Sequence, residues 1–178
     1  MYRFAASDEI DINSISIALL NYLCATKAKE RFLVRLNGTK NKEETQDELL
    51  EILSLFGIQY DALYHKSQNR KFYHQCAAQL LSSAKAFSCF CTHEQLSSNQ
   101  NGQYDGRCEQ LSDKEVLNNE SPFTIRIKKP KEPISFTDLI KGEFTYRPQD
   151  IDSFVILHQD KTPTNDFATA VDDMLQGV

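Results

Sequence analysis

The sequence contains few glycines and prolines, no excess of positive charge and no long hydrophobic run. Its 178 residues include 6 Gly and 5 Pro, too few for a collagen-like or linker-dominated chain. Lys and Arg number 20 against 25 Asp and Glu, and the pI of about 5.4 argues against a broadly basic nucleic-acid coat.

Two further absences concern targeting. The longest uncharged stretch, residues 12–26, is too short to cross a bilayer and contains polar residues. Asp8, Glu9 and Asp11 occupy the region that would be positive in a secretory signal. We therefore expect a soluble, cytoplasmic protein with no membrane partner and no DNA partner.

Hydrophobic periodicity in the first half predicts alternating strands and helices. Strands are expected at 2–6 and 31–36, and helices at 15–24, 43–56 and 71–84. This order predicts a parallel α/β sheet. The first helix carries Ile17, Leu20 and Cys24 on a second apolar face, which predicts burial on both faces. On the third helix, Phe72 and Cys76 are expected to face inward.

The composition changes after residue 85. Segments rich in β-forming residues follow at 123–128 and 134–147, which predicts a small α+β insert. A strand at 154–157 and a helix at 165–176 then predict a return to the α/β layer. The expected domains are a Rossmann-type first half over 1–85, an insert over 86–150, and a return strand and helix over 151–178.

Five cysteines stand at positions 24, 76, 89, 91 and 108. An odd number with three in twenty residues is atypical of a secreted disulfide framework and favours a metal site. Cys89, Cys91 and Cys108 supply three thiolates for zinc and leave a fourth position for His93, Tyr104 or water. The alternative is a set of buried apolar cysteines without metal. Cys24 and Cys76 are expected in the core.

Several segments, in order along the chain, resemble one family. They are Arg3-Phe-Ala, Ala18-Leu-Leu-Asn-Tyr-Leu23, Phe32-Leu-Val-Arg-Leu36, Ser67-Gln68 with Arg70 and Tyr73, Tyr104-Asp-Gly-Arg-Cys108, Phe136-Thr-Asp-Leu-Ile-Lys-Gly-Glu143, Asp152-Ser-Phe-Val-Ile-Leu157 and Val171-Asp-Asp-Met-Leu175. Together they resemble the glutamyl-tRNA synthetases, which are class I aminoacyl-tRNA synthetases.

The resemblance implies a fold, a metal site and partners. The fold is the first part of a Rossmann-type doubly wound parallel sheet, interrupted by an α+β zinc-bearing insert that binds the tRNA acceptor end. Similarity to a short paralogue that modifies a tRNA implies four zinc ligands and leaves His93 outside the site; these ligands are Cys89, Cys91, Tyr104 and Cys108. The resemblance also implies Arg3 and Ser7 as candidate glutamate contacts; the alternative for Arg3 is a solvated side chain.

The sequence departs from the family where ATP and glutamate should bind. The family's H-I-G-H turn, which meets ATP, reads Asp11-Ile12-Asn13-Ser14 here, so its catalytic residues are unknown. Asp11 places negative charge where an anion must bind. The alternative role for Asn13 and Ser14 is helix capping. The family's R-I-E-D-T-D reads Arg35-Leu-Asn-Gly-Thr-Lys40, and the pocket tyrosine of its P-T-Y motif is Asn165.

The insert keeps a basic segment. Residues 126–147 include six Lys or Arg and three Asp or Glu, and the resemblance places this region against the acceptor stem. Lys128, Lys129, Lys131 and Lys141 are the expected phosphate contacts. The alternative is a solvated strand face. Phe144 and Tyr146 are expected in the core or in strand pairing rather than stacked on bases.

Three functional hypotheses follow. The leading one is a truncated synthetase-like protein that binds the tRNA acceptor end without ligase activity, because the chain stops at Val178 where the family continues. A partner chain would then complete its sheet. The second is an active glutamate–tRNA ligase, which alone would require ATP. The third is a zinc-stabilised protein-interaction module.

Overall fold

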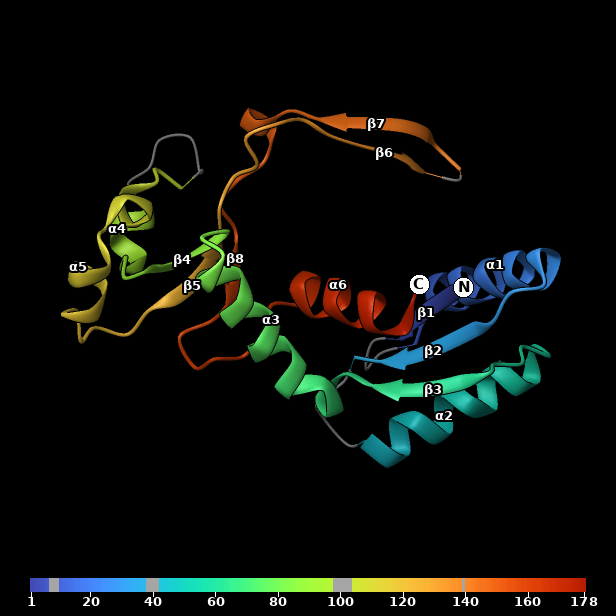
Figure 1. Ribbon diagram of the computed structural model, residues 1–178. Helices are drawn as coiled ribbons and strands as arrows, with labels where there is room; N and C mark the ends of the chain where they lie inside the picture. The colour runs from blue at the N-terminus through green and yellow to red at the C-terminus, as the bar shows by residue number, and fades with distance from the viewer. Residues whose placement is uncertain (7–9, 38–41, 98–103, 139) are drawn as a thin grey trace. The chain divides into compact units, whose positions relative to one another are not determined.

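The computed structural model describes residues 1–6, 10–37, 42–97, 104–138 and 140–178. The chain divides into two compact units (Figure 1). The first unit comprises Met1–Tyr73 and Ala168–Val178, and the second comprises His74–Phe167. Both the helix α3 (Arg70–Ser82) and the helix α6 (Asn165–Gln176) contribute residues to each unit.

The first unit is built around a three-stranded parallel sheet in the order β1-β2-β3, which confirms the predicted parallel α/β arrangement. Two helices connect these strands, and a 3-10 helix follows the last of them. The bounds are β1 (Tyr2–Ala6), α1 (Ile12–Ala28), β2 (Phe32–Leu36), α2 (Lys42–Leu55), β3 (Ala62–His65) and the 3-10 helix η1 (Lys66–Asn69). The central strand is β2, and all five of its residues are buried, as expected for a strand covered on both faces.

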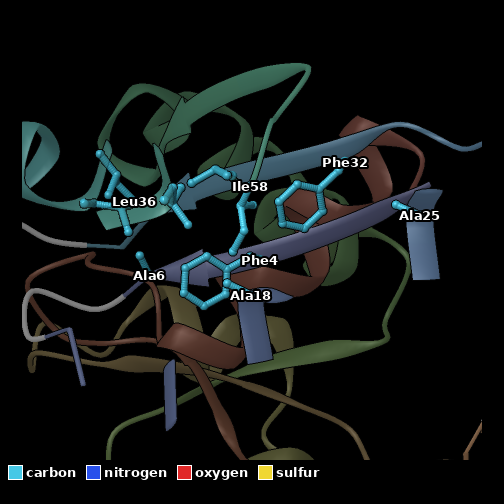
Figure 2. Packing of buried hydrophobic residues seen from close by; sticks show 10 residues of the cluster. Phe4, Ala6, Ala18, Ala25, Phe32, Leu36 and Ile58 are labelled. Carbon is cyan, nitrogen blue, oxygen red and sulfur yellow. The ribbon is translucent and has the colours of Figure 1, made fainter. Parts of the chain in front are cut away.

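The hydrophobic core lies on one face of this sheet. Figure 2 shows Phe4 of β1 beside Ala18 of α1, and Phe32 of the neighbouring strand β2 belongs to the same buried cluster. Leu49 and Leu53 of α2 belong to the same buried cluster, so both helices cover this face. Alternation along β2 turns Leu33 and Arg35 to the opposite face. The polar partners of Arg35 therefore lie on the face of the sheet opposite the hydrophobic core.

The expectation that α1 is buried on two faces is wrong for the described residues. Ile17 and Leu20 are 54% and 59% exposed, and Cys24 is also exposed. One face of α1 packs through Ala18 and Ala25 against the sheet, and small side chains there allow close approach. A hydrophobic residue predicts burial only when an element exists to cover it.

The predicted inward face of α3 is also displaced by one residue. Tyr73 and Ala77 are buried, whereas Phe72 is 43% exposed and Cys76 is half-buried. Periodicity indicates a helix but leaves its rotation open, and Phe72 is the more apolar of the two neighbouring aromatic residues. The buried position belongs to Tyr73 because its hydroxyl has polar partners.

The second unit has an antiparallel sheet in the order β4-β5-β8 and a separate hairpin, β6-β7 (Figure 1). Its strands are β4 (Ala86–Cys89), β5 (Thr124–Ile127), β6 (Ile134–Asp138), β7 (Gly142–Tyr146) and β8 (Val155–Leu157). Short helices fill its loops: α4 (His93–Ser97), η2 (Arg107–Gln110), α5 (Asp113–Leu117) and η3 (Pro148–Asp150).

The strand expected at 154–157 does not join the parallel sheet. It forms β8, which pairs antiparallel with β5 through Ile125 and Leu157. Three apolar residues indicate a strand but not its partner, because pairing depends on contacts far apart in sequence. None of the helices in the described ranges is long and apolar enough to cross a membrane.

Candidate metal centre

Local structure brings three cysteines of the second unit together. Cys89 ends β4, and Cys91 lies two residues further on, just before α4. Thr92 and Gln95 bond reciprocally, the Thr92 N–H donating to Gln95 Oε1 at 3.0 Å, and this fixes the start of that helix. Cys108 lies in η2, which follows a turn with Gly106 at φ 82°. A left-handed residue at this point favours glycine.

The four predicted ligands converge in space. The Sγ atoms of Cys89, Cys91 and Cys108 all lie within 4.8 Å of one another. Cys91 Sγ is 3.5 Å from Cys108 Sγ, and the Tyr104 hydroxyl is 3.6 Å from Cys89 Sγ and 3.9 Å from Cys91 Sγ. The backbone N–H of Cys108 donates to the same hydroxyl at 2.9 Å.

These distances suit a tetrahedral zinc ion. Zinc–sulfur bonds of about 2.3 Å place two thiolates about 3.8 Å apart, and a phenol oxygen about 3.5 Å from each sulfur. Three of the separations, at 3.5–3.9 Å, lie close to these values, and the remaining sulfur pairs lie within 4.8 Å. Three sulfurs and one oxygen therefore form a donor set that fits zinc. His93 is exposed at the start of α4 and is not in the converging group of described residues.

The electrostatics of the cluster set Cys89 apart from Cys91 and Tyr104. Burial raises the pKa of Cys91 to about 12, with further increases from Cys108 and Cys89. Burial also raises the pKa of Tyr104. Cys89 differs: burial raises its pKa, but the Cys91 backbone N–H, the Tyr104 hydroxyl and other donors outweigh this and lower it. A bound divalent cation would favour the thiolate form of its cysteine ligands.

Two residues outside the cysteine pattern support Tyr104. The backbone N–H of Tyr104 donates to Asp152 Oδ1 at 3.1 Å. The Arg126 guanidinium carbon lies 4.5 Å from the centroid of the Tyr104 ring. Sequence reasoning missed both residues. The available signal was a charge inside an apolar strand, since Arg126 is flanked by Ile125 and Ile127.

A second polar cluster, in the first unit, was also missed. Asp172 is fully buried and accepts hydrogen bonds from Arg35 Nη1 at 3.0 Å, Asn69 Nδ2 at 2.8 Å and the Tyr73 hydroxyl at 2.9 Å. Arg35 also donates to Thr169 at 2.7 Å. This cluster joins β2 to η1, α3 and α6. It is internally paired, which is typical of a structural network.

The predicted glutamate contacts lie near this cluster or outside the described residues. Arg3 Nη2 donates to Asp173 Oδ2 at 3.0 Å, and its Nε is paired with Oδ1 of the same carboxylate. A substrate carboxylate would have to displace Asp173. Ser7 lies outside the described residues.

The degenerate turn forms a cap at the start of α1. Asp11 is the N-cap, and its Oδ1 accepts from Ser14 N at 2.8 Å and from Ser14 Oγ at 2.6 Å. The Ser14 side chain lowers the pKa of Asp11, and the Ser14 backbone N–H lowers it further. Capping was the alternative role expected for Asn13 and Ser14; the capping carboxylate itself comes from Asp11, and Asn13 bonds it at 3.3 Å.

The predicted phosphate-binding lysines all lie in the second unit. Lys129 Nζ is 4.0 Å from Asp152 Oδ1, Lys128 is half-buried, and Lys131 and Lys141 are exposed. On the neighbouring hairpin, three aromatic rings stack with centroids 5.6–6.3 Å apart; these are Phe136, Phe144 and Tyr146. Phe144 and Tyr146 of β7 each pair with a residue of β6, which confirms their expected role in strand pairing.

Comparisons with known proteins extend these observations. A family model described as tRNA synthetases class I (E and Q), catalytic domain, matches residues 3–178. The chain is 48% identical to Glutamate--tRNA ligase 1 of Campylobacter concisus and 47% identical to that of Campylobacter curvus. In both cases it is covered completely and spans 44% of the relative's length.

A solved structure gives the same result. The glutamate tRNA ligase from Elizabethkingia meningosepticum, solved in complex with its amino acid, superposes with a TM-score of 0.85 at 25% identity. The match covers 99% of this chain and 42% of that one. The chain thus belongs to the family of class I tRNA synthetase catalytic domains for glutamate and glutamine, and it matches the N-terminal catalytic portion of glutamyl-tRNA synthetases.

Proposed function

We propose that the chain is a synthetase-like protein that binds the tRNA acceptor end and does not activate glutamate. The observation that carries the second part is the Asp11 cap. The amino end of a helix attracts anions because its backbone N–H groups are free and its dipole is positive. Here the Ser14 N–H is already bonded to a carboxylate. A fixed negative charge therefore stands where the resemblance implies a nucleotide-binding turn.

The acceptor-end proposal rests on the second unit. Lys131 and Lys141 are exposed and can approach phosphates, while Lys129 Nζ lies 4.0 Å from Asp152 Oδ1. Phe136 and Tyr146 are 49% and 43% exposed, so the hairpin also offers aromatic faces on which unpaired bases can stack. Basic and aromatic groups in one unit suit a single-stranded nucleic-acid end.

Zinc is the metal that we propose for the cysteine centre. The three thiols and the Tyr104 hydroxyl would hold it, and the ion would tie the end of β4 to η2. Its role would be structural, because four protein donors leave no open position for a substrate. ATP enters the proposal only if the chain is catalytically active.

A partner chain is a further part of the proposal. Among the described residues, β1 is hydrogen-bonded to a strand on one side only, where β2 lies. An open strand edge can accept another strand. The exposed apolar residues Ile17, Leu20 and Leu23 of α1 would be covered by the same partner.

The relatives support a competing proposal, an active ligase, because both relatives described above are named as glutamate–tRNA ligases. Glutamate-dependent ATP–pyrophosphate exchange, measured with and without tRNA on protein freed of host synthetase, separates the two. We expect no exchange above a control without the protein. Exchange above that control would overturn the proposed inactivity and show that the Asp11–Ser14 turn is a working variant.

Titration with tRNA at several salt concentrations tests the binding. The variant Lys131→Gln/Lys141→Gln should lower the salt slope of log K by about 0.7–0.9 for each phosphate that the protein no longer neutralises. Lys114→Gln, at an exposed lysine of α5, is the matched control and should change nothing. An absence of tRNA binding by the unaltered protein would favour the third possibility, a zinc-stabilised protein-interaction module.

A further inference from the structure

Arg126 faces the same side of the second sheet as the candidate metal centre. It lies on β5 directly opposite Phe87 of β4, and Cys89 lies opposite Thr124. Residues two apart along a strand point to the same face, so Arg126 and Cys89 share one. Their positions follow from the strand register and do not depend on a metal ion.

Among the described residues, Arg126 is a buried charge without a carboxylate partner. The residue is only 8% exposed, yet none of the ion pairs found among the described residues includes it. Its Nη1 donates to the Ser153 carbonyl at 2.7 Å, and its buried Nε has no nitrogen or oxygen partner within the described ranges. Burying a guanidinium without a counter-charge is costly, so an anionic group is expected beside it.

The groups beside Arg126 are the proposed metal ligands. Its guanidinium carbon lies 4.5 Å from the Tyr104 ring centroid, and the guanidinium interacts with the Cys89 side chain. A zinc ion with three thiolates and a neutral phenol carries a net charge of −1, and with a phenolate it carries −2. Buried negative charge of this size needs a nearby cation.

We propose that Arg126 is the counter-cation of the metal centre: a positioning residue that binds no metal itself but holds Cys89 and Tyr104 in place and offsets the charge of the loaded site. This inference rests on the proposed zinc site. Outer groups of this kind commonly change metal affinity about 10- to 100-fold. The loaded site would thus supply the negative charge that Arg126 lacks, and Arg126 would offset the net negative charge of that site.

The test compares zinc affinity in the full chain by competition with a chromophoric chelator. Arg126→Gln should weaken zinc binding by about 10- to 100-fold. Arg126→Lys keeps the charge and should stay closer to the unaltered protein. Arg147→Gln is the matched control, since Arg147 is an exposed arginine of the same unit that pairs with Asp150, and it should have no effect.

Cobalt substitution supplies a readout that a merely structural role would not change. The sulfur-to-cobalt charge-transfer band reports on the coordinated thiolates, Cys89 among them, and it should shift in Arg126→Gln but not in Arg147→Gln. If Arg126→Gln fails to fold, Arg126→Lys carries the test: a band and an affinity near those of the unaltered protein support the charge role, and a loss of more than about 100-fold overturns it.

The outcomes for the two proposals are separable. An unaltered protein that binds no zinc overturns the metal proposal and this inference with it. An unaltered protein that binds zinc, together with an Arg126→Gln variant of equal affinity and unchanged cobalt spectrum, overturns this inference alone.

Discussion

Each unit of the chain holds a buried polar cluster, and the two clusters differ in how their charge is balanced. In the first unit, Arg35 pairs with Asp172 and Arg3 pairs with Asp173, so each cation has its own carboxylate. In the second unit, three thiols and a phenol converge with Arg126 as the neighbouring cation. In the first cluster each arginine has a carboxylate beside it, whereas in the second three thiols and a phenol share one neighbouring cation.

The surroundings of the two clusters show the same contrast. The buried Asp172 carboxylate accepts bonds from three side chains, which replace the water that it loses. The pKa of Cys91, by contrast, is raised to about 12, because burial and the neighbouring sulfurs disfavour a second negative charge. A buried network that satisfies itself stabilises a fold, and one that does not is a candidate ligand site.

The largest expected effect is the loss of zinc from the second cluster. Cys108→Ala removes one of three thiolate donors and should weaken zinc binding by more than about 100-fold, because a direct ligand matters more than its supporting groups. Metal analysis of purified protein should give about one zinc per chain before the change and close to none after it. Cys24→Ala, at an exposed cysteine of α1, is the matched control and should keep its zinc.

Two results would contradict this expectation. The unaltered protein could contain no zinc and show three reactive thiols, which would mean that the cluster is a set of buried cysteines. Equal zinc content in Cys108→Ala and in the unaltered protein would place the ion elsewhere.

A second effect should fall on the first cluster. Asp172→Ala leaves Arg35 buried without its counter-charge, which should cost about 3–5 kcal/mol of unfolding free energy. Urea unfolding followed by circular dichroism measures this cost. Tyr73→Phe removes one hydroxyl from the same carboxylate and should cost less, about 1–3 kcal/mol. Neither variant should change the zinc content, because zinc is proposed for the second cluster alone; a changed zinc content would contradict this.

A double variant sharpens the same point. Arg35→Met/Asp172→Leu replaces the buried ion pair with apolar groups and should recover much of the stability lost in Asp172→Ala. If the double variant is as unstable as Asp172→Ala, the hydrogen bonds of the cluster stabilise the fold in addition to the pairing of its charges.

Much of the fold could be predicted from the sequence because local patterns determine it. Alternating apolar strands and helices predicted β1, α1, β2, α2 and α3, and the parallel pairing of β1 with β2 followed. The rotation of α3 could not be predicted in this way. Phe72 is the more apolar neighbour, but Tyr73 is buried because its hydroxyl bonds Asp172, which lies 99 residues away.

The candidate metal centre, too, could be predicted from the sequence only in part. The spacing of Cys89, Cys91 and Cys108 indicated the thiol cluster, since short spacings imply closeness in space. Arg126 and Asp152 could not be assigned to it, because their contacts with Tyr104 depend on the register of β5 and on the path of the chain after the hairpin. Long-range contacts of single polar residues leave no periodic trace in a sequence.

The smallest expected effect concerns Asp11, whose charge is exposed rather than buried. Its pKa lies below the ordinary value of 3.8 because Ser14 donates to it in the folded chain. A carboxyl whose pKa is lowered by folding contributes stability above its unfolded pKa and loses that contribution as the pH falls through the folded value. The difference in melting temperature between the unaltered protein and Asp11→Ala should therefore be constant from pH 7 to about pH 5 and shrink below about pH 4.

Asp11→Asn separates the charge of this cap from its hydrogen bonds. An amide oxygen also accepts from the Ser14 N–H, so this variant should keep most of the cap and show a flatter pH profile below about pH 4. If Asp11→Asn and Asp11→Ala melt alike at every pH, the cap acts through charge alone. A nucleotide phosphate would then meet that charge directly at the start of α1. If the cap acts through hydrogen bonds instead, it excludes a phosphate because Asp11 already occupies the N–H and hydroxyl donors of Ser14.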